Sequence, residues 1–223
     1  SALRSFLRYS LCKGLIVTDL AKVVPRIATW PCSTLPTTLS QSQIQTLLGS
    51  LDMNSRSGHR NRALFHTLRR LGIRAGEARS LRLEDLHWRA RTITVRGKGG
   101  HASELPLPED LAEELAIYIR DHRPQCQARE VFVTAKPPFR ALARSETVSC
   151  IVGRALRKAG IDVPRGAAHL LRHALATSLR NRQASLRKIS HILRHKSLRT
   201  TAIYARMDIA SLREMALPWP GGT

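Results

Sequence analysis

Apolar residues recur at helical spacing along most of this chain, and one glycine-rich turn interrupts them. The periodicity predicts a mainly α fold. The segments "RTITVRG" and "ASELPLP" flank the turn "GKGG" and predict a small antiparallel β-hairpin. A further strand is predicted at "EVFVTA", residues 130–135. Helices are predicted over 2–22 (one helix and the start of a second), 39–51, 58–72, 108–122, 146–160, 167–181, 184–194 and 198–215.

The charge balance points to a polyanionic partner. Lysine and arginine number 37 against 16 acidic residues, a formal net charge of +21 over 223 residues. The basic residues occur throughout the predicted helices rather than in a tail. A ribosomal or membrane-surface protein, or a generally basic soluble surface, are the alternatives. Double-stranded DNA is the partner that we expect, because arginine suits bidentate contacts with phosphate.

Composition also bounds the compartment and the domains. No apolar run approaches a membrane span and no secretory signal is visible, so we expect a cytoplasmic protein without a membrane partner. The four cysteines have no paired spacing, which favours reduced thiols. Three prolines in "VVPRIATWPCSTLPTT" predict a linker. We predict a helical remnant over 1–30, a linker over 31–38 and the main domain over 39–223.

The segment "HLLRH" places three cationic or ionisable side chains on one helical face. His169, Arg172 and His173 stand at positions i, i+3 and i+4, amid leucine and alanine. A zinc pair is one interpretation, but Leu170 stands where a helical metalloprotease carries glutamate. Core histidines bonded to carbonyl groups are another, and suit His173 best. A phosphate explains the cluster best, because arginine and histidine donate charge-assisted hydrogen bonds to its oxygens.

Three other segments carry candidate residues. Arg74 follows a predicted helix end at Gly72, and Glu77 stands where it can hold the guanidinium group of Arg74. Alone this pattern is typical of a surface ion pair. Lys98 lies in the hairpin turn, either as a solvated lysine or as a proton donor to a leaving group. The last segment, "SHILRHKSLRTTAIYARMD", carries His195 and Tyr204.

The order of these residues resembles the catalytic domain of tyrosine recombinases, the phage integrase family. The similarity covers roughly 38–215, through "GIRAGEARSLRLEDL", "RGKGG…LPLP", "HLLRHALAT" and "LRHKSLRTTAIYARMD". The resemblance implies a tyrosine-recombinase fold and a DNA strand-transferase without a metal or cofactor. It also implies a tetrameric synapse with other recombinase protomers. The implied catalytic residues are Arg74, Lys98, His169, Arg172, His195 and Tyr204, supported by Glu77 and His173.

The resemblance assigns each of these residues a role. Two guanidinium groups, those of Arg74 and Arg172, would clamp the scissile phosphate, and Lys98 would protonate the departing 5′-hydroxyl. His169 would assist proton transfer at the nucleophile, and His195 would donate to a non-bridging oxygen. The attack of Tyr204 on phosphorus would leave a 3′-phosphotyrosyl link. Glu77 would orient Arg74, and His173 would be a buried supporting residue.

Two positions depart from the family pattern, which usually has glycine where this chain has Gln183 and Arg194. Both follow predicted helix ends, where a left-handed conformation is favoured. A non-glycine residue there costs about 1 kcal/mol. Residues 1–30 resemble the end of the family's core-binding domain. With no initial methionine and most of that domain missing, we expect a fragment or an N-terminally truncated copy.

The sequence therefore predicts a site-specific recombinase or integrase that cleaves and rejoins DNA. Two alternatives stay open. One is a truncated or decayed integrase that acts only as a DNA-binding module. The other is a type IB topoisomerase, which uses similar chemistry without exchanging partners. A covalent protein–DNA adduct on a nicked substrate would separate the enzyme from the binding module.

Overall fold

The computed structural model describes residues 2–25, 38–97, 100–162, 167–194 and 201. The chain divides into two compact units, Ser1–Thr34 and Leu35–Thr223. The first unit contains α1 (Ala2–Cys12) and a 3₁₀ turn, η1 (Leu20–Lys22). The predicted assignment of residues 1–30 to a remnant of a core-binding domain stays a prediction.

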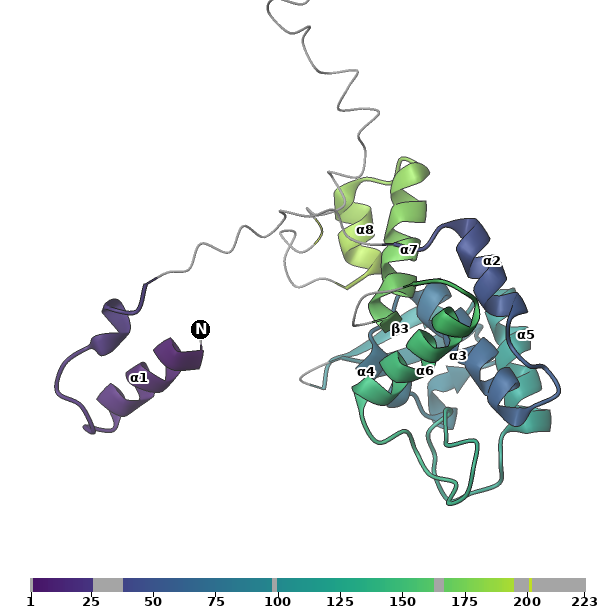
Figure 1. Ribbon diagram of the computed structural model, residues 1–223, viewed down its shortest axis with the longest axis horizontal. Coiled ribbons are helices and arrows are strands. Elements are labelled where there is room, and N and C mark those ends of the chain that lie inside the picture. The colour runs from purple at the N-terminus through teal and green to yellow at the C-terminus, as the bar shows by residue number, and fades with distance from the viewer. Residues whose placement is uncertain (1, 26–37, 98–99, 163–166, 195–200, 202–223) are drawn as a thin grey trace, which may run out of the picture. The chain divides into compact units, whose positions relative to one another are not determined.

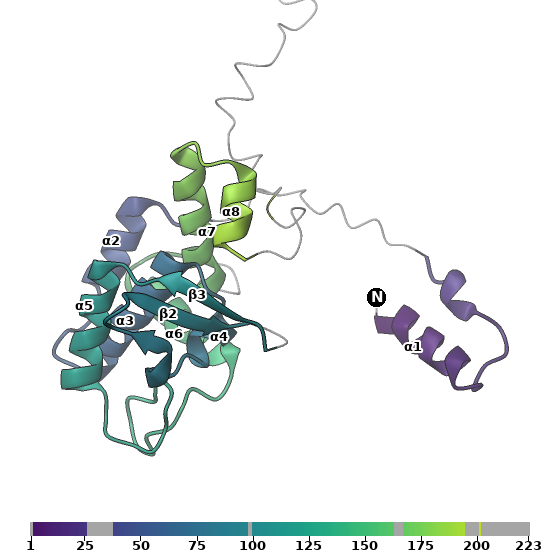
Figure 2. The same cartoon turned by 180° about the vertical axis from the view of Figure 1, so that it is seen from behind.

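The second unit is mainly helical, as predicted, and carries one small sheet (Figure 1). The order of the sheet is β1-β2-β3, and both pairs are antiparallel. Figures 1 and 2 show the sheet on one side of this unit and α6 on the opposite side, with α3 between them. Its elements are α2 (Gln41–Gly49), α3 (Arg56–Leu71), α4 (Ala75–Arg79), η2 (Leu83–Asp85), β1 (Leu86–His87), β2 (Thr92–Arg96), β3 (Ala102–Pro106), α5 (Glu109–Ile117), η3 (Tyr118–His122), α6 (Ser145–Lys158), α7 (Ala167–Asn181) and α8 (Leu186–Ile192).

Helix α3 is the centre of this unit and packs against α5 and α7. Its apolar positions recur at helical spacing, so Leu64, Phe65 and Leu68 are all buried. Gly72 ends the helix in a left-handed conformation with φ of 57°, which glycine adopts at no steric cost. The helix end that was predicted at Gly72 is confirmed. The chain leaves this turn directly into the residues of the candidate site.

The predicted hairpin is confirmed, and its hydrogen-bonded ladder extends as far as Gly97. Strand β2 pairs with β3 from Thr92, opposite Pro106, to Arg96, opposite Ala102. Ile93 and Val95 point into the core, whereas the alternate residues of β2 do not. The N–H group of Gly97 donates to the carbonyl oxygen of His101, at 2.9 Å, and closes the ladder.

The strand predicted over residues 130–135 is wrong. Val131, Phe132 and Val133 are fully buried, so the segment contributes to the core although it forms no strand. It pairs only through isolated bridges, because the facing chain bends into η2 after residue 82 and cannot continue a ladder. Buried β-branched residues therefore do not by themselves specify a strand.

Several other boundaries follow local signals. Ser40 and Gln43 form the predicted capping box of α2. The helix predicted over 108–122 continues from α5 into a π-helical turn, η3. The helix predicted over 184–194 is shorter than expected, and the one predicted over 198–215 lies outside the described residues except for Thr201. Both predicted left-handed positions are confirmed, with φ of 60° at Gln183 and 53° at Arg194.

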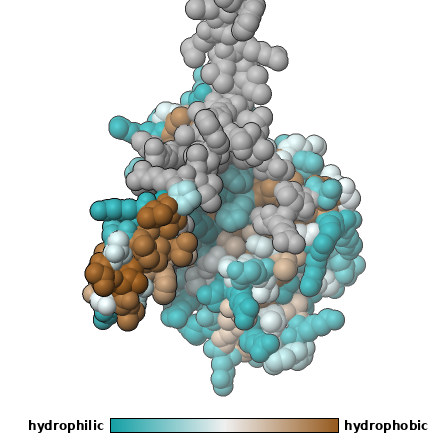
Figure 3. All heavy atoms as spheres, turned by 60° about the vertical axis from the view of Figure 1, so that its left-hand side comes forward, coloured by the Kyte–Doolittle hydropathy of each residue, from teal (hydrophilic) through white to brown (hydrophobic). Residues whose placement is uncertain are grey.

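The first unit leaves much of its apolar surface exposed. In α1, Phe6 is 62% exposed and Tyr9 is 57% exposed, and Ser10 is the one buried residue of the helix. Exposed hydrophobic residues of the first unit form a patch in Figure 3, where the visible coloured surface of the second unit is largely polar. The contrast indicates that the core of the chain belongs to the second unit.

Candidate active site

Arg74 stands at the N-terminus of α4, where Glu77 holds it twice. One carboxylate oxygen of Glu77 accepts the backbone N–H group of Arg74 at 2.9 Å, and the other accepts its guanidinium Nη1 at 2.9 Å. Glu77 is buried, whereas the side chain of Arg74 is 44% exposed. The contact that the sequence predicted between these residues is present. It holds the backbone and one guanidinium nitrogen of Arg74, and it leaves part of the guanidinium group open to a ligand.

A cavity of about 420 Å³ opens beside Arg74. It brings together the end of β2, the start of α4, the start of α6 and the first turn of α7, which are far apart in the sequence. Arg74 and His169, 95 positions apart, both line it. The lining residues are Arg74, Ala75, Gly76, Glu77, Ser80, Arg96, Gly97, Ser145 and His169.

Arg172 is buried and is not among the residues that line this cavity. Its side chain is 5% exposed, and its guanidinium group donates to the carbonyl oxygens of Gly72 and Leu193. The bond to Leu193 measures 2.6 Å. Arg172 therefore ties the turn before Arg74 to the end of α8. The predicted contact of Arg172 with phosphate stays a prediction.

The two histidines of α7 lie close together, with ring centroids 6.4 Å apart. Partial burial lowers the pKa of His169, and the charges of Arg172 and Arg74 lower it further. His173 was predicted to be buried but is only half-buried; this partial burial lowers its pKa, followed by the effects of His169 and Arg172. Both rings are therefore largely uncharged at neutral pH. A neutral His169 on the cavity surface can accept a proton.

Two arginines near the cavity were missed by the sequence predictions of site residues. Arg96 lines the cavity, and its guanidinium group pairs with Asp85, whose side chain is 3% exposed. Its place on the strand beside the glycine-rich turn could have marked it. Arg194 donates to Glu77 at 2.7 Å. No local spacing links these two residues, because 117 positions separate them.

Three predicted catalytic residues, Lys98, His195 and Tyr204, lie outside the described residues. Two of them directly follow described residues in the chain. Gly97, on the cavity lining, precedes Lys98, and Arg194 precedes His195.

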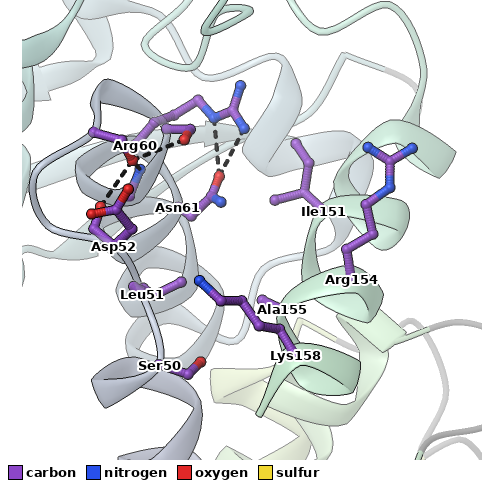
Figure 4. A pocket seen from close by; sticks show the side chains of 12 residues that line it. Ser50, Leu51, Asp52, Arg60, Asn61, Ile151, Arg154, Ala155 and Lys158 are labelled. Carbon is purple, nitrogen blue, oxygen red and sulfur yellow. Dashed lines mark hydrogen bonds between the residues drawn. The ribbon is translucent and has the colours of Figure 1, made fainter.

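A second cavity, of about 390 Å³, lies between the start of α3 and the C-terminal half of α6. Figure 4 shows Arg60 and Asn61 on one side of it, and Arg154 and Lys158 on the other. Arg60 is 8% exposed and donates to the amide oxygen of Asn61 and to the carbonyl oxygen of Val133. Because Arg60 is held by these partners, we read it as a structural residue.

Within the described part of the chain, no three or more histidine, cysteine, aspartate or glutamate residues cluster as metal ligands would. In the same part, none of the helices combines the length and apolar character that crossing a membrane requires.

Comparisons with known proteins agree on one family. Residues 37–210 match the Phage integrase family. A protein of Sinorhizobium fredii named as an integrase/recombinase is 42% identical over 221 residues, which cover 99% of this chain and 54% of the relative. The tyrosine recombinase XerD of Pseudomonas putida is 33% identical over 218 residues, 96% of this chain and 72% of that protein.

Solved structures agree with these relatives. XerH site-specific recombinase, in a post-cleavage complex with its difH substrate, has a TM-score of 0.67 and 29% identity. The match covers 88% of this chain and 56% of that one.

This chain spans about half the length of its first Sinorhizobium relatives. Three findings lead to one assignment. They are the mainly helical unit with one antiparallel sheet, the arginine held by a glutamate, and the family match over residues 37–210. The chain belongs to the phage integrase family of tyrosine recombinases.

Proposed function

We propose that this chain cleaves and rejoins DNA strands through a 3′-phosphotyrosyl intermediate. The single observation that carries the proposal is the shared cavity of Arg74 and His169, where a clamped cation and a neutral imidazole face the same space. Attack of an oxygen nucleophile on a phosphodiester can use both groups. The cation stabilises charge on the phosphate oxygens, and the imidazole accepts a proton.

In the proposed reaction, the phenolic oxygen of Tyr204 attacks phosphorus. Its proton leaves toward His169, while the bond between phosphorus and the 5′-oxygen of the next nucleotide breaks. The Lys98 ammonium group gives a proton to that oxygen, which departs as a free 5′-hydroxyl. The new bond links Tyr204 to the 3′-phosphate. Attack by a 5′-hydroxyl then reverses the steps and restores the DNA, so no external energy source is needed.

The two arginines and His195 would neutralise the charge that develops on the non-bridging oxygens. Guanidinium groups that are fixed before the reaction lose no energy in reorganising during it. The bonds of Glu77 to Arg74, and of the carbonyl groups to Arg172, supply this fixation. Because fixed arginines carry the charge, we propose that cleavage is independent of metal ions. Full activity in the presence of EDTA would support this.

DNA and further protomers are the proposed partners. XerH was solved bound to its difH substrate, and lambda integrase was solved as a dimer on a core site and as a tetramer on a Holliday junction. We propose the same kind of assembly here, on double-stranded DNA in the cytoplasm. The net charge of +21 supports an anionic partner.

Covalent trapping tests this function. The chain is incubated with a pool of nicked duplexes whose half-sites are randomised. The nick lets the cleaved end dissociate after cleavage, and this loss blocks rejoining. We expect a band that combines protein and DNA after denaturing electrophoresis. DNA binding without such a band would contradict strand transfer and favour a DNA-binding module.

A further inference from the structure

Arg194 connects the end of α8 to the candidate active site. It follows the C-cap residue Leu193, and its backbone is left-handed, with φ of 53°. Its side chain is 16% exposed, and its Nη2 donates to Oε2 of Glu77 at 2.7 Å. Glycine adopts this backbone at no steric cost, whereas arginine does not. A residue that is unfavourable for the backbone here makes a contact that glycine cannot make.

Glu77 is the point where three segments of the site meet. Its Oε2 accepts both the N–H group of Arg74 and the guanidinium group of Arg194, and its Oε1 accepts the guanidinium group of Arg74. A Cβ atom on Gly97 would lie 3.9 Å from Oε1, so the carboxylate also borders the start of the hairpin turn. Glu77 is 6% exposed.

Electrostatics favour this arrangement. Burial alone would raise the pKa of Glu77, but the bonds from Arg74 and the charge of Arg194 outweigh burial and lower it. The carboxylate therefore stays charged near neutral pH. A buried carboxylate with two cationic partners holds both of them firmly, since its oxygens are shielded from competing water.

We propose that Arg194 is a positioning residue for DNA cleavage, which fixes Arg74 through their shared Glu77 and fixes the backbone at Leu193 and Arg194. This inference rests on the proposed strand-transfer function. Two consecutive residues are held at this point, because Arg172 binds the carbonyl oxygen of Leu193 while Arg194 binds Glu77. Two bonds on neighbouring residues restrict both the position and the direction of the backbone.

Three substitutions at position 194 separate the effect of the side-chain ion pair from the effect of the left-handed backbone conformation. Arg194→Gly relieves the left-handed conformation but removes the ion pair, Arg194→Ala removes the pair alone, and Arg194→Lys keeps a cation. Because misplacement by about 1 Å can cost about 100-fold in rate, we expect Gly and Ala to slow adduct formation by about 10- to 100-fold. Lys should recover part of this loss. DNA affinity should stay within about twofold in all three, since Arg194 acts on the geometry of other groups.

Gln183→Gly is the matched control. Gln183 is also left-handed, with φ of 60°, and it is exposed and outside the cavity. Its replacement should leave the rate of adduct formation unchanged. In a Glu77→Gln background, Arg194→Ala should add less than about threefold, because the two residues act as one unit. An Arg194→Gly variant as fast as the parent chain would overturn the proposal.

A readout without catalysis separates this proposal from the proposed function. If the parent chain forms no adduct, the strand-transfer function fails. The side-chain ¹⁵N–¹H signal of Arg74, assigned by its loss in Arg74→Lys, still reports on Arg194. Arg194→Ala should move that signal and Gln183→Gly should not. An Arg74 signal that is unchanged in Arg194→Ala would overturn the positioning role.

Discussion

The guanidinium group of Arg172 donates to the carbonyl oxygen of Gly72, although 100 positions separate the two residues. Gly72 is the left-handed residue that ends α3, and Arg74 follows two positions later. The contact therefore joins helix α7 to the turn that aims Arg74 at the cavity. A residue implied to act on phosphate also holds together the backbone around the site.

Replacing Arg172 should therefore impair folding as well as DNA cleavage. Arg172→Ala leaves two buried carbonyl groups without this partner, and each loss costs about 1–3 kcal/mol. We expect urea unfolding to show a loss of about 2–6 kcal/mol, with weaker DNA binding and no adduct. Arg187→Ala, at an exposed position of α8, is the control and should leave stability nearly unchanged. A fully stable Arg172→Ala variant would show that these bonds contribute little.

Gly72 should tolerate no side chain without cost. A Cβ atom there would lie 2.8 Å from Cδ2 of Leu175 and 2.9 Å from Cδ2 of Leu193, in a backbone with φ of 57°. The left-handed conformation alone costs alanine about 1–2 kcal/mol. Gly160→Ala is a matched control, because Gly160 has φ of 71° and open space around it. Thermal unfolding should show a larger loss for Gly72→Ala, and equal losses would contradict a role for the crowding.

Glu77 should make stability depend on pH in the acid range. Burial opposes ionisation, yet the bonds from Arg74 and the charge of Arg194 lower its pKa in the folded state. Its stabilisation is therefore complete above the unfolded pKa, near 4.3. It is lost as pH falls through the lower folded value.

The measurement compares the parent chain with Glu77→Gln in urea unfolding from pH 7 to acid pH. The stability difference should be largest near neutral pH and should shrink below about pH 4. Glu113→Gln, an exposed position of α5, controls for the change in net charge. A difference that stays constant down to the acid limit would contradict the ion pairs of Glu77 as the source of its effect.

DNA binding by this chain should weaken steeply with salt. If six phosphates are contacted, the logarithm of the affinity should fall with the logarithm of the salt concentration with a slope of about −5. Binding should be largely independent of sequence, because phosphate contacts carry no base information. Fluorescence anisotropy over a salt series measures the slope. A flat response would mean that the net charge of +21 is not used on DNA.

Local patterns predicted the parts of the site that lie close together in the chain. The three-residue spacing of Arg74 and Glu77 predicted their contact, and the one-turn spacing of His169 and His173 predicted their proximity. Helix ends were predicted where glycine or a left-handed residue stops the helix, as at Gly72. These features depend on backbone geometry over one or two turns, which sequence spacing encodes directly.

Contacts between distant segments were not predicted from spacing. The bond from Arg194 to Glu77 joins the end of α8 to α4, and no local rule of sequence spacing specifies that contact. Arg96 was missed for a related reason, since its cavity forms only when α4, α6 and α7 meet the sheet. The strand predicted over residues 130–135 failed because its facing chain turns away into η2.

The most direct test of the central claim is the identity of the residue that becomes joined to DNA. Adducts formed by the parent chain on nicked duplexes are digested with protease and nuclease, and the modified peptide is sequenced by mass spectrometry. We expect a 3′-nucleotide on Tyr204. Tyr204→Phe, which removes one oxygen atom, should form no adduct and bind DNA within about twofold of the parent chain. Adducts that persist in Tyr204→Phe, or a nucleotide on another residue, would contradict the proposed mechanism.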